Sequence, residues 1–231
     1  MNRRPLCLIP SRGGSKRLAR KNLIQLGDKP LLAWTIEAAL GAKLFDEVWV
    51  SSDDEDMLES ARQFGASAWP RPETLASDET TLLQLCLVLM EDGLIQQRGY
   101  TDLYMMLPTS PFRQSATIQK AWRYFMDSDA DALLSVTALD HPPQWSLAET
   151  KEGYLKPWQP EAYELPRQQL QPIFREDGGH TIVRLSALQA QRKFLVSKAV
   201  PFQPPPEETI DINTEMDLAW ANFLLQQGRV D

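Results

Sequence analysis

The chain has 231 residues, of which 43% are hydrophobic and 24% are charged, and its formal net charge is −7 at pH 7. This length and composition are enough to bury the core of one globular domain, so we treat residues 1–231 as a single domain. The acidic balance argues against nucleic acid or an anionic membrane as a partner, because both bind broad basic surfaces.

The cysteine content and the first residues indicate a cytoplasmic location. Cys7 and Cys86 are the only cysteines, too few for a disulfide framework, and we expect both in the core of a protein from a reducing compartment. The first apolar stretch ends at Pro10, which is short for a secretion signal. No other apolar run in the sequence is long enough to span a membrane.

Strand-like apolar runs alternate with helical segments from residue 6 to residue 136. Strands are predicted at residues 6–9, 47–52, 66–69, 102–107 and 131–136. Helices are predicted at residues 30–40, 54–65, 80–95 and 114–126, with Gly65 closing the second. This alternation predicts a parallel sheet covered by helices on both faces.

The alternation stops after Val136. Residues 140–172 contain six prolines and scattered aromatic residues without helical or strand periodicity, so we expect them to leave the sheet. Order returns at residues 180–191, followed by a strand at 198–202, a turn at 203–208, a strand at 209–212 and a helix at 214–227.

A basic loop follows the first predicted strand. Its five cations surround the Gly13-Gly14 turn and are Arg12, Lys16, Arg17, Arg20 and Lys21. Glycines let the backbone approach a phosphate, and the cations neutralise it. The loop matches neither the dinucleotide nor the Walker pattern. It is either a solvated basic loop or an anion site, and its many charges favour a polyphosphate over a single phosphate.

Two oxygen-bearing side chains lie near the C-terminal end of the predicted sheet. Asp211 and Asn213 are two positions apart, so on a strand they share a face, where a hard cation such as Mg²⁺ would bridge them to phosphate oxygens. The alternative is that Asn213 or Thr214 caps the last helix, with Glu215 and Asp217 in its first turn. Both roles are compatible.

Other polar segments favour structural roles when taken alone. SSDDED, residues 51–56, is typical of a helix N-cap with an acidic first turn. LPTSPFR, residues 107–113, is a loop entering a helix. His141 and His180 are isolated from any cysteine or paired histidine, so we do not expect a zinc site.

Together these segments resemble the acylneuraminate cytidylyltransferase family, the CMP-sialic acid synthetases. The similar segments, in the family's order, are IPSRGGSKRLARKN, AKLFDEVWVSSDDE, RPETLASDETT, LPTSPFR, ELPRQQLQPIFR and TIDINTEMDL. The resemblance implies a doubly wound, mostly parallel α/β sheet of the Rossmann-like nucleotidyltransferase type. It also implies that residues 140–172 form a small inserted dimerisation arm, which reaches over the neighbouring subunit's site in a homodimer.

The resemblance also implies a nucleotide site. Arg12, Gly13, Gly14, Ser15, Lys16 and Lys21 would wrap the triphosphate of CTP, with Asn22 on the ribose. Arg71, Ser77 and Thr80 would lie near the cytidine. Mg²⁺ would be held by Asp211 and Asn213, and Arg12, Lys21 and Asp211 would be the catalytic residues.

The implied partner of CTP is a sialic-acid-like sugar acid. Leu107, Thr109 and Ser110 would line its pocket, and Arg167 and Arg175 would hold its carboxylate. The anomeric hydroxyl of this 2-keto-3-deoxy acid would attack the α-phosphorus of CTP, and pyrophosphate would leave. Such transfers depend mostly on positioning and charge neutralisation, so neither a nucleophile nor a histidine-based triad is required.

Three positions depart from the family pattern. Asn213 stands where the metal pair usually has a second aspartate, which puts metal affinity in doubt. Leu107 replaces a glutamine common before PTSP, and DGGHTI, residues 177–182, replaces NGAIY; Gly179 and His180 would reshape the same pocket. We therefore expect the sugar to be not N-acetylneuraminic acid but a relative with less polar or differently placed substituents. Remaining alternatives are a catalytically weakened nucleotide- or sugar-binding protein, a Kdo-like acid, or another nucleotide.

Overall fold

A computed structural model describes residues 5–14, 18–75, 80–91 and 93–230. The predicted site residues Ser15, Lys16 and Ser77 lie outside these ranges. Within them, no helix is long and apolar enough to cross a lipid bilayer.

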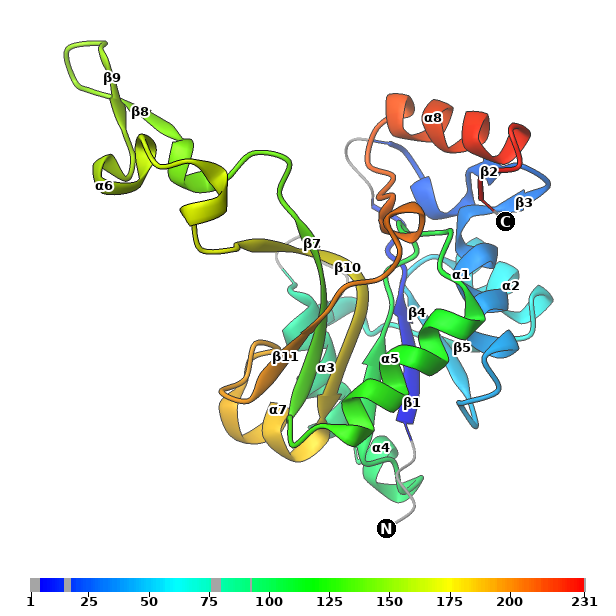
Figure 1. Cartoon of the computed structure of the whole chain (residues 1–231). Coiled ribbons are helices and arrows are strands. Elements are labelled where there is room, and N and C mark those ends of the chain that lie inside the picture. The colour runs from blue at the N-terminus through cyan, green and yellow to red at the C-terminus, as the bar shows by residue number, and fades with distance from the viewer. Residues whose placement is uncertain (1–4, 15–17, 76–79, 92, 231) are drawn as a thin grey trace.

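A seven-stranded sheet forms the centre of the molecule (Figure 1), with the strand order β11-β7-β10-β6-β1-β4-β5. Its strands are β1 (Pro5–Pro10), β4 (Val48–Ser52), β5 (Ser67–Pro70), β6 (Asp102–Met105), β7 (Ala132–Ala138), β10 (Phe174–Arg184) and β11 (Ala199–Phe202). All neighbouring strands pair in parallel except that β10 runs antiparallel to both β6 and β7. The predicted mostly parallel α/β fold is confirmed.

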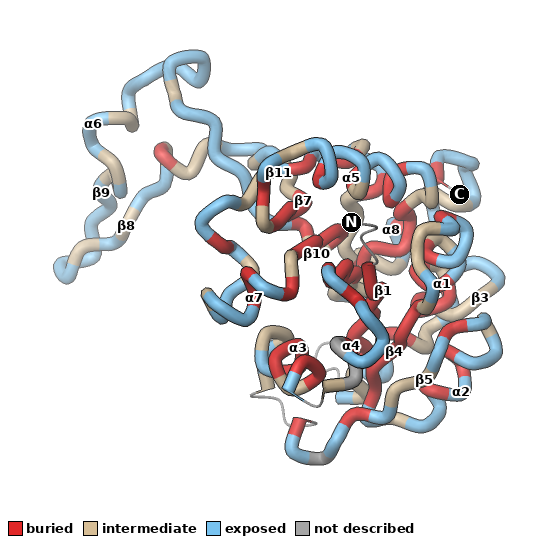
Figure 2. The backbone as a smooth tube through the Cα atoms, turned by 90° about the horizontal axis from the view of Figure 1, so that it is seen from below, coloured by how far each residue is buried: buried red, intermediate tan, exposed pale blue. Residues whose placement is uncertain are grey.

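Helices cover both faces of this sheet. The helices are α1 (Leu31–Gly41), α2 (Glu55–Gln63), α3 (Leu82–Glu91), α4 (Leu94–Gln97), α5 (Ser115–Asp127) and α7 (Leu185–Gln191). Alternate residues of β1 enter two different cores: Cys7 and Ile9 pack with α1, α2 and α5, whereas Leu6 and Leu8 pack with α3, α4 and α7. Burial on both faces explains why this strand is apolar throughout, and Figure 2 shows its backbone as buried.

The last helix, α8 (Glu215–Gln226), closes a third core beside β2 (Gln25–Leu26) and β3 (Lys29–Pro30). Thr214 and Asp217 form a capping box at its start, because each side chain accepts a backbone N–H of the other. The capping role predicted for Thr214 is therefore confirmed. The capping box fixes the point at which the chain passes from residues 210–213 into α8.

Residues between β7 and β10 leave the sheet as an arm (Figure 1). The arm contains β8 (Leu147–Glu149), β9 (Leu155–Pro157), α6 (Pro160–Tyr163) and the short 3-10 helices η3 (Pro143–Trp145) and η4 (Arg167–Gln169). Figure 2 shows most of its backbone as exposed. Three large apolar side chains near its end, Tyr154, Leu155 and Trp158, are 73%, 69% and 68% exposed.

Two predicted elements are wrong. The helix expected at 80–95 is divided, because Gly93 adopts a φ of +71° between α3 and α4. The strand expected at 209–212 is absent: η5 (Pro206–Thr209) precedes an irregular segment, residues 210–213. This segment makes one backbone hydrogen bond to a loop, from Ile212 N to Thr109 O at 2.8 Å, rather than a ladder to a strand.

Candidate active site

Four loops meet where parallel strands β1, β4, β5 and β6 end. Because carboxyl ends of parallel strands lie at one edge of a sheet, the residues after each strand converge there. The basic loop follows β1, Asp53 and Asp54 follow β4, Arg71 follows β5, and Leu107 lies in the loop after β6. This edge is the candidate active site.

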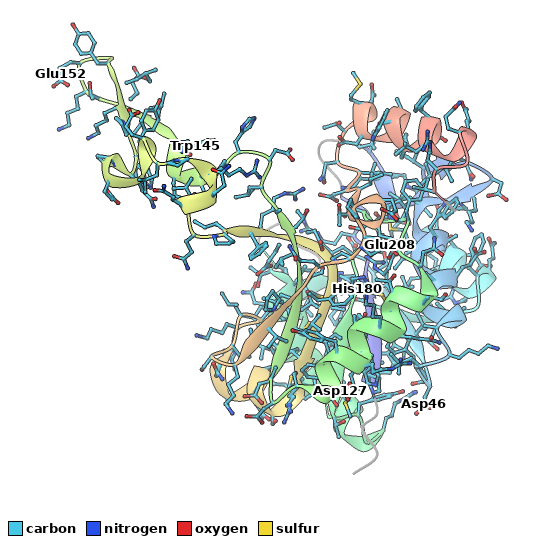
Figure 3. All side chains as sticks on the ribbon, viewed as in Figure 1. Asp46, Asp127, Trp145, Glu152, His180 and Glu208 are labelled. Atoms are coloured by element: carbon cyan, nitrogen blue, oxygen red, sulfur yellow. The ribbon has the colours of Figure 1, made fainter. Side chains whose placement is uncertain are left out.

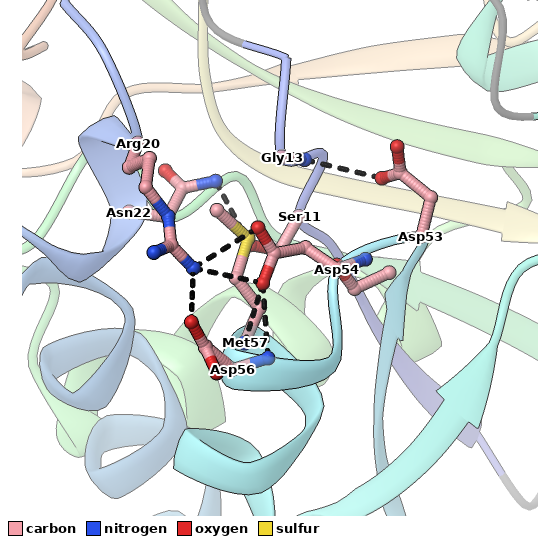
Figure 4. Close-up of polar contacts among 9 residues, drawn as sticks. Ser11, Gly13, Arg20, Asn22, Asp53, Asp54, Asp56 and Met57 are labelled. Atoms are coloured by element: carbon pink, nitrogen blue, oxygen red, sulfur yellow. Dashed lines mark hydrogen bonds and ion pairs between the residues drawn. The ribbon is translucent and has the colours of Figure 1, made fainter.

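The acidic residues after β4 hold the Gly-Gly turn of the basic loop (Figure 4). The backbone N–H of Gly13 donates to Asp53 Oδ1 at 3.1 Å. A Cβ at Gly13 would lie 3.0 Å from Asp54 Cβ, so the two loops approach each other too closely for a larger residue without rearrangement. Asp54 also caps α2 by accepting from Asp56 N and Met57 N, which confirms the predicted N-cap.

Arg20 is committed to this acidic segment. Its Nη2 donates to Asp54 Oδ1 at 3.0 Å and to Asp56 Oδ2 at 2.6 Å (Figure 4). Its backbone has a φ of +50°, a conformation that side chains other than glycine rarely adopt. The ion pairs fix this turn, so Arg20 shapes the end of the basic loop instead of offering its charge to an anion.

Asn22 lies at the floor of the basic loop. Its Nδ2 donates to Ser11 Oγ at 2.8 Å, and that hydroxyl in turn contacts Met57 Sδ at 3.0 Å (Figure 4). Asn22 Oδ1 is buried and makes no hydrogen bond to the described residues. A buried carbonyl oxygen of this kind is suited to accept a hydrogen bond from a ligand hydroxyl.

Lys21 joins the basic loop to the segment before α8. Its Nζ donates to Ile212 O at 2.9 Å and to Asn213 Oδ1 at 3.0 Å. Asn213 Nδ2 donates to a carboxylate oxygen of Asp211, so these two side chains are adjacent although their segment is not a strand. The fold thus brings Lys21, Asn213 and Asp211 together from opposite ends of the chain.

Arg71 adds a buried positive charge beside the loop. Its Nη2 donates to Ser51 O at 3.2 Å, and the residue is 7% exposed. Burial lowers the pKa of Arg71, the negative charge of Asp53 raises it, and the positive charge of Arg12 lowers it. Asp53 and Arg12 therefore both lie close enough to Arg71 for their charges to act on its guanidinium. Thr80, half-buried, lies beyond the segment that the structure leaves undescribed.

Leu107 packs against the bulge of β10 on the other side of the site. A Cβ at Gly178 would lie 2.7 Å from Leu107 Cδ1, and Gly178 has a φ of +71°. Ser110, in the same loop, is buried and its Oγ has no partner among the described residues. Thr109 holds residue 212 through its carbonyl oxygen. The sugar-site candidates in this loop therefore stand between the β10 bulge and the Asp211 segment.

The side chain of His180 does not line the candidate active site. It is 1% exposed, its Nδ1 lies 2.7 Å from the Tyr104 hydroxyl, and its ring packs on Phe202. Burial and the nearby charge of Arg113 keep the pKa of His180 well below its ordinary value. The expectation that His180 reshapes the pocket is wrong, because its side chain belongs to the core.

Sequence reasoning missed two buried charges that hold the loop after β6. Arg113 is 2% exposed and donates to Leu107 O at 3.2 Å and Thr35 Oγ1 at 3.3 Å; burial lowers its pKa to about 10. Glu208 accepts from Gln114 N at 3.0 Å and Thr117 Oγ1 at 2.6 Å at the start of α5. Burial raises the pKa of Glu208.

The residues present fit a cation that arrives with a nucleotide. Among the described residues, no group of three or more His, Cys, Asp or Glu side chains is placed to hold a metal ion. Asp211 and Asn213 supply two adjacent oxygen donors. Mg²⁺ at phosphate sites commonly takes one or two carboxylates and completes its shell with phosphate oxygens and water. The pair therefore fits Mg²⁺ only together with a polyphosphate.

A family model described as cytidylyltransferase matches residues 6–225. The chain belongs to the cytidylyltransferase family. Members of this family are nucleotidyltransferases, so the protein is an enzyme of that class. The match spans both halves of the candidate active site, from the basic loop to Asp211 and Asn213.

Curated relatives act on different sugar acids, according to their names. The chain is 31% identical to a CMP-N,N'-diacetyllegionaminic acid synthase of Legionella pneumophila, over 96% of this chain and 97% of the relative. It is 29% identical to a pseudaminic acid cytidylyltransferase of Campylobacter jejuni, over 95% of each. It is also 29% identical to an N-acylneuraminate cytidylyltransferase of Streptococcus agalactiae, over 93% of this chain but only 51% of the relative.

Solved structures share the fold. A CMP:2-keto-3-deoxy-manno-octonic acid synthetase complexed with CTP superposes with a TM-score of 0.70 at 17% identity, over 97% of this chain and 99% of that one. At this identity the likeness supports the architecture of the cytidylyltransferase and not its substrate.

Two arginines predicted to hold the sugar carboxylate lie at the arm of this cytidylyltransferase. Arg167 donates to the carbonyl oxygens of Asp140 and Leu139 at 3.2 and 3.3 Å, where the arm begins. Arg175 is exposed on β10, opposite Thr137. Neither arginine makes a hydrogen bond or ion pair to the described part of the basic loop within one chain.

Proposed function

We propose that the protein transfers CMP from CTP to a nonulosonic-type 2-keto-3-deoxy sugar acid and releases pyrophosphate. The observation that carries this proposal is the link between the anchored basic loop and the Asp211 segment through Lys21. This link brings cations and oxygen ligands together at the carboxyl edge of the sheet. Curated relatives that match nearly the whole chain are named for CMP transfer to such acids.

In this proposal the protein positions two substrates and neutralises charge. Arg12 and Lys21 contact the phosphates and stabilise the negative charge that develops on the leaving pyrophosphate. Asn22 accepts from a ribose hydroxyl through its unpartnered Oδ1. Asp211 and Asn213 hold Mg²⁺, which when bound would supply further positive charge at the phosphates. The anomeric hydroxyl of the sugar acid attacks the α-phosphorus, and the bond to pyrophosphate breaks.

The sugar that we propose carries apolar or acylated substituents toward Leu107. A leucine offers neither donor nor acceptor, so a sugar hydroxyl facing it would lose a hydrogen bond that water supplies. Gly178 leaves the notch that Leu107 fills, so neither of these two residues presents a polar side chain. These two residues therefore favour deoxy and diacetamido nonulosonic acids over N-acetylneuraminic acid.

We also propose a homodimer built through the arm. Tyr154, Leu155 and Trp158 expose more apolar surface than a monomer normally leaves in water. In such a dimer the arm of one subunit covers the site of its partner, which would bring Arg167 or Arg175 to the sugar carboxylate there. The buried free thiols of Cys7 and Cys86 fit a reducing compartment, and we place the reaction in the cytoplasm.

The experiment that tests the proposed function is a pyrophosphate-release screen of the purified protein with CTP, UTP, GTP and ATP against a panel of nonulosonic acids and Kdo. We expect release only with CTP and a nonulosonic acid. Binding of CTP without release for any acid would favour a catalytically silent binding protein instead.

A further inference from the structure

A chain of hydrogen bonds joins Lys21, Asn213 and Asp211. A carboxylate in place of the Asn213 amide would break this chain. Asn213 accepts from the Lys21 ammonium through Oδ1 and donates to Asp211 through Nδ2. Both halves of the amide are therefore used, one toward each charge. A carboxylate at position 213 has no hydrogen to donate, so its oxygen would face that of Asp211 directly.

The charges around this chain show what such a replacement would do. Asp217, the carboxylate that contacts the backbone of Asn213, already accepts from Asn213 N, Thr214 N and Thr214 Oγ1. Lys21 is a cation that contacts position 213 directly. With aspartate at position 213, Lys21 would face two adjacent carboxylates, and their repulsion would favour the binding of a divalent cation.

We propose that, in the nucleotide-free protein, Asn213 allows Lys21 of the basic loop to stay bonded to the Asp211 segment without a divalent cation. Lys21 supplies there the positive charge that a pair of carboxylates would take from a metal ion. The cation then enters with the nucleotide, when phosphate oxygens complete its shell. The inference rests on the proposed function only in treating Asp211 and Asn213 as the cation ligands of a CTP site.

The test compares nucleotide-free wild type, Asn213→Asp and Lys21→Met by Mn²⁺ titration with paramagnetic resonance and by thermal unfolding in EDTA and in Mg²⁺. Asn222→Asp is the matched control, because it also adds a carboxylate but its Oδ1 already accepts from Gly27 N, away from Asp211. We expect the melting temperature of wild type and of the control to be the same with and without Mg²⁺.

Asn213→Asp should melt lower in EDTA, recover in Mg²⁺, and bind Mn²⁺ about tenfold more tightly than wild type, because one more negative charge faces the ion. Lys21→Met should also bind Mn²⁺ about tenfold more tightly, because a repelling ammonium is removed. If Asn213→Asp does not fold, Lys21→Met decides alone.

The proposal is overturned if Mg²⁺ raises the melting temperature of wild type, or if the folded variants bind Mn²⁺ no more tightly than wild type. These measurements use no nucleotide or sugar. Failure of the proposed function would appear instead as absent pyrophosphate release, and would leave the binding results unchanged.

Discussion

Leu107 and Gly178 fit together where the loop after β6 meets the bulge of β10 at the candidate active site: a Cβ on Gly178 would lie only 2.7 Å from Leu107 Cδ1. The loop after β6 and the bulge of β10 therefore cannot vary independently. The two departures from the family pattern at these segments therefore contact each other, and we propose that they form one apolar wall of the sugar site.

Gly178→Ala is expected to destabilise the fold by about 1–3 kcal/mol, because it adds a positive-φ strain and a clash with Leu107. Chemical denaturation measures this loss. Gly228→Ala is the matched control, since Gly228 has a φ of +60° but no atom within 4 Å of an added Cβ. Leu107→Ala should relieve part of the Gly178→Ala loss in the double variant; equal losses at Gly178 and Gly228 would contradict the contact.

The apolar wall also predicts substrate preference. With CTP, kcat/KM should be higher for deoxy or diacetamido nonulosonic acids than for N-acetylneuraminic acid, because Leu107 cannot bond a polar substituent. Leu107→Gln should narrow this difference. The interpretation of Leu107 is wrong if N-acetylneuraminic acid is the best substrate of wild type by about tenfold or more.

Removing either proposed phosphate contact should weaken CTP binding. A charge-assisted hydrogen bond is worth about 1.5–3 kcal/mol, so Arg12→Ala and Lys21→Ala should each lower CTP affinity by about 10- to 150-fold in calorimetric titration. Lys198→Ala is the control, because its ammonium pairs with Asp129. Lys198 directly precedes β11, so it lies at the amino ends of the parallel strands, opposite the candidate site. Unchanged affinity in both site variants would exclude these residues from the triphosphate site.

Glu208 should make stability depend on pH. Burial raises the pKa of Glu208 above its ordinary value of 4.5, so the folded protein holds this proton more firmly than the unfolded chain. The stabilising contribution of Glu208 is therefore fully present below pH 4.5 and is lost as the pH rises through the higher folded-state pKa. In urea unfolding, the free energy of unfolding of wild type minus that of Glu208→Gln should fall as the pH rises through that window. A stability difference between wild type and Glu208→Gln that is the same at every pH would contradict this prediction.

The arm should control the oligomeric state. Light scattering at micromolar concentration should give a dimer mass for wild type, and a monomer mass for the double variant Tyr154→Ser and Trp158→Ser, because these side chains are largely exposed in one chain. Tyr124→Ser removes an aromatic residue of α5 that is 47% exposed, away from the arm, and should leave the dimer intact. A wild-type monomer would exclude the proposed dimer.

The sheet was predictable because its buried strands are continuous apolar runs bounded by turns. The run at residues 6–9 illustrates this: β1 is apolar throughout since it serves a core on each face. The strand expected at 209–212 failed for the opposite reason. The backbone N–H of Ile212 donates to the carbonyl oxygen of Thr109 in a loop and not to a strand, and no local pattern distinguishes one such bond from a ladder.

The candidate site was predictable in parts but not in its connections. The basic loop and Asp211 with Asn213 are visible as separate motifs, whereas the Lys21 to Asn213 bond joins residues 192 positions apart. Glu208 follows a run of prolines and resembles an exposed turn; only its contact with the start of α5 buries it. Figure 3 shows Glu208 and His180 within the body, far from Trp145 and Glu152 on the arm.

Pyrophosphate release with CTP and a nonulosonic acid is the most direct measurement of the central claim. We expect release that requires both substrates, formation of the CMP-linked sugar acid in equal amount, and loss of both in Lys21→Ala with retention in Lys198→Ala. Absence of release with CTP across the whole panel of sugar acids, from a folded protein that binds CTP, would contradict it.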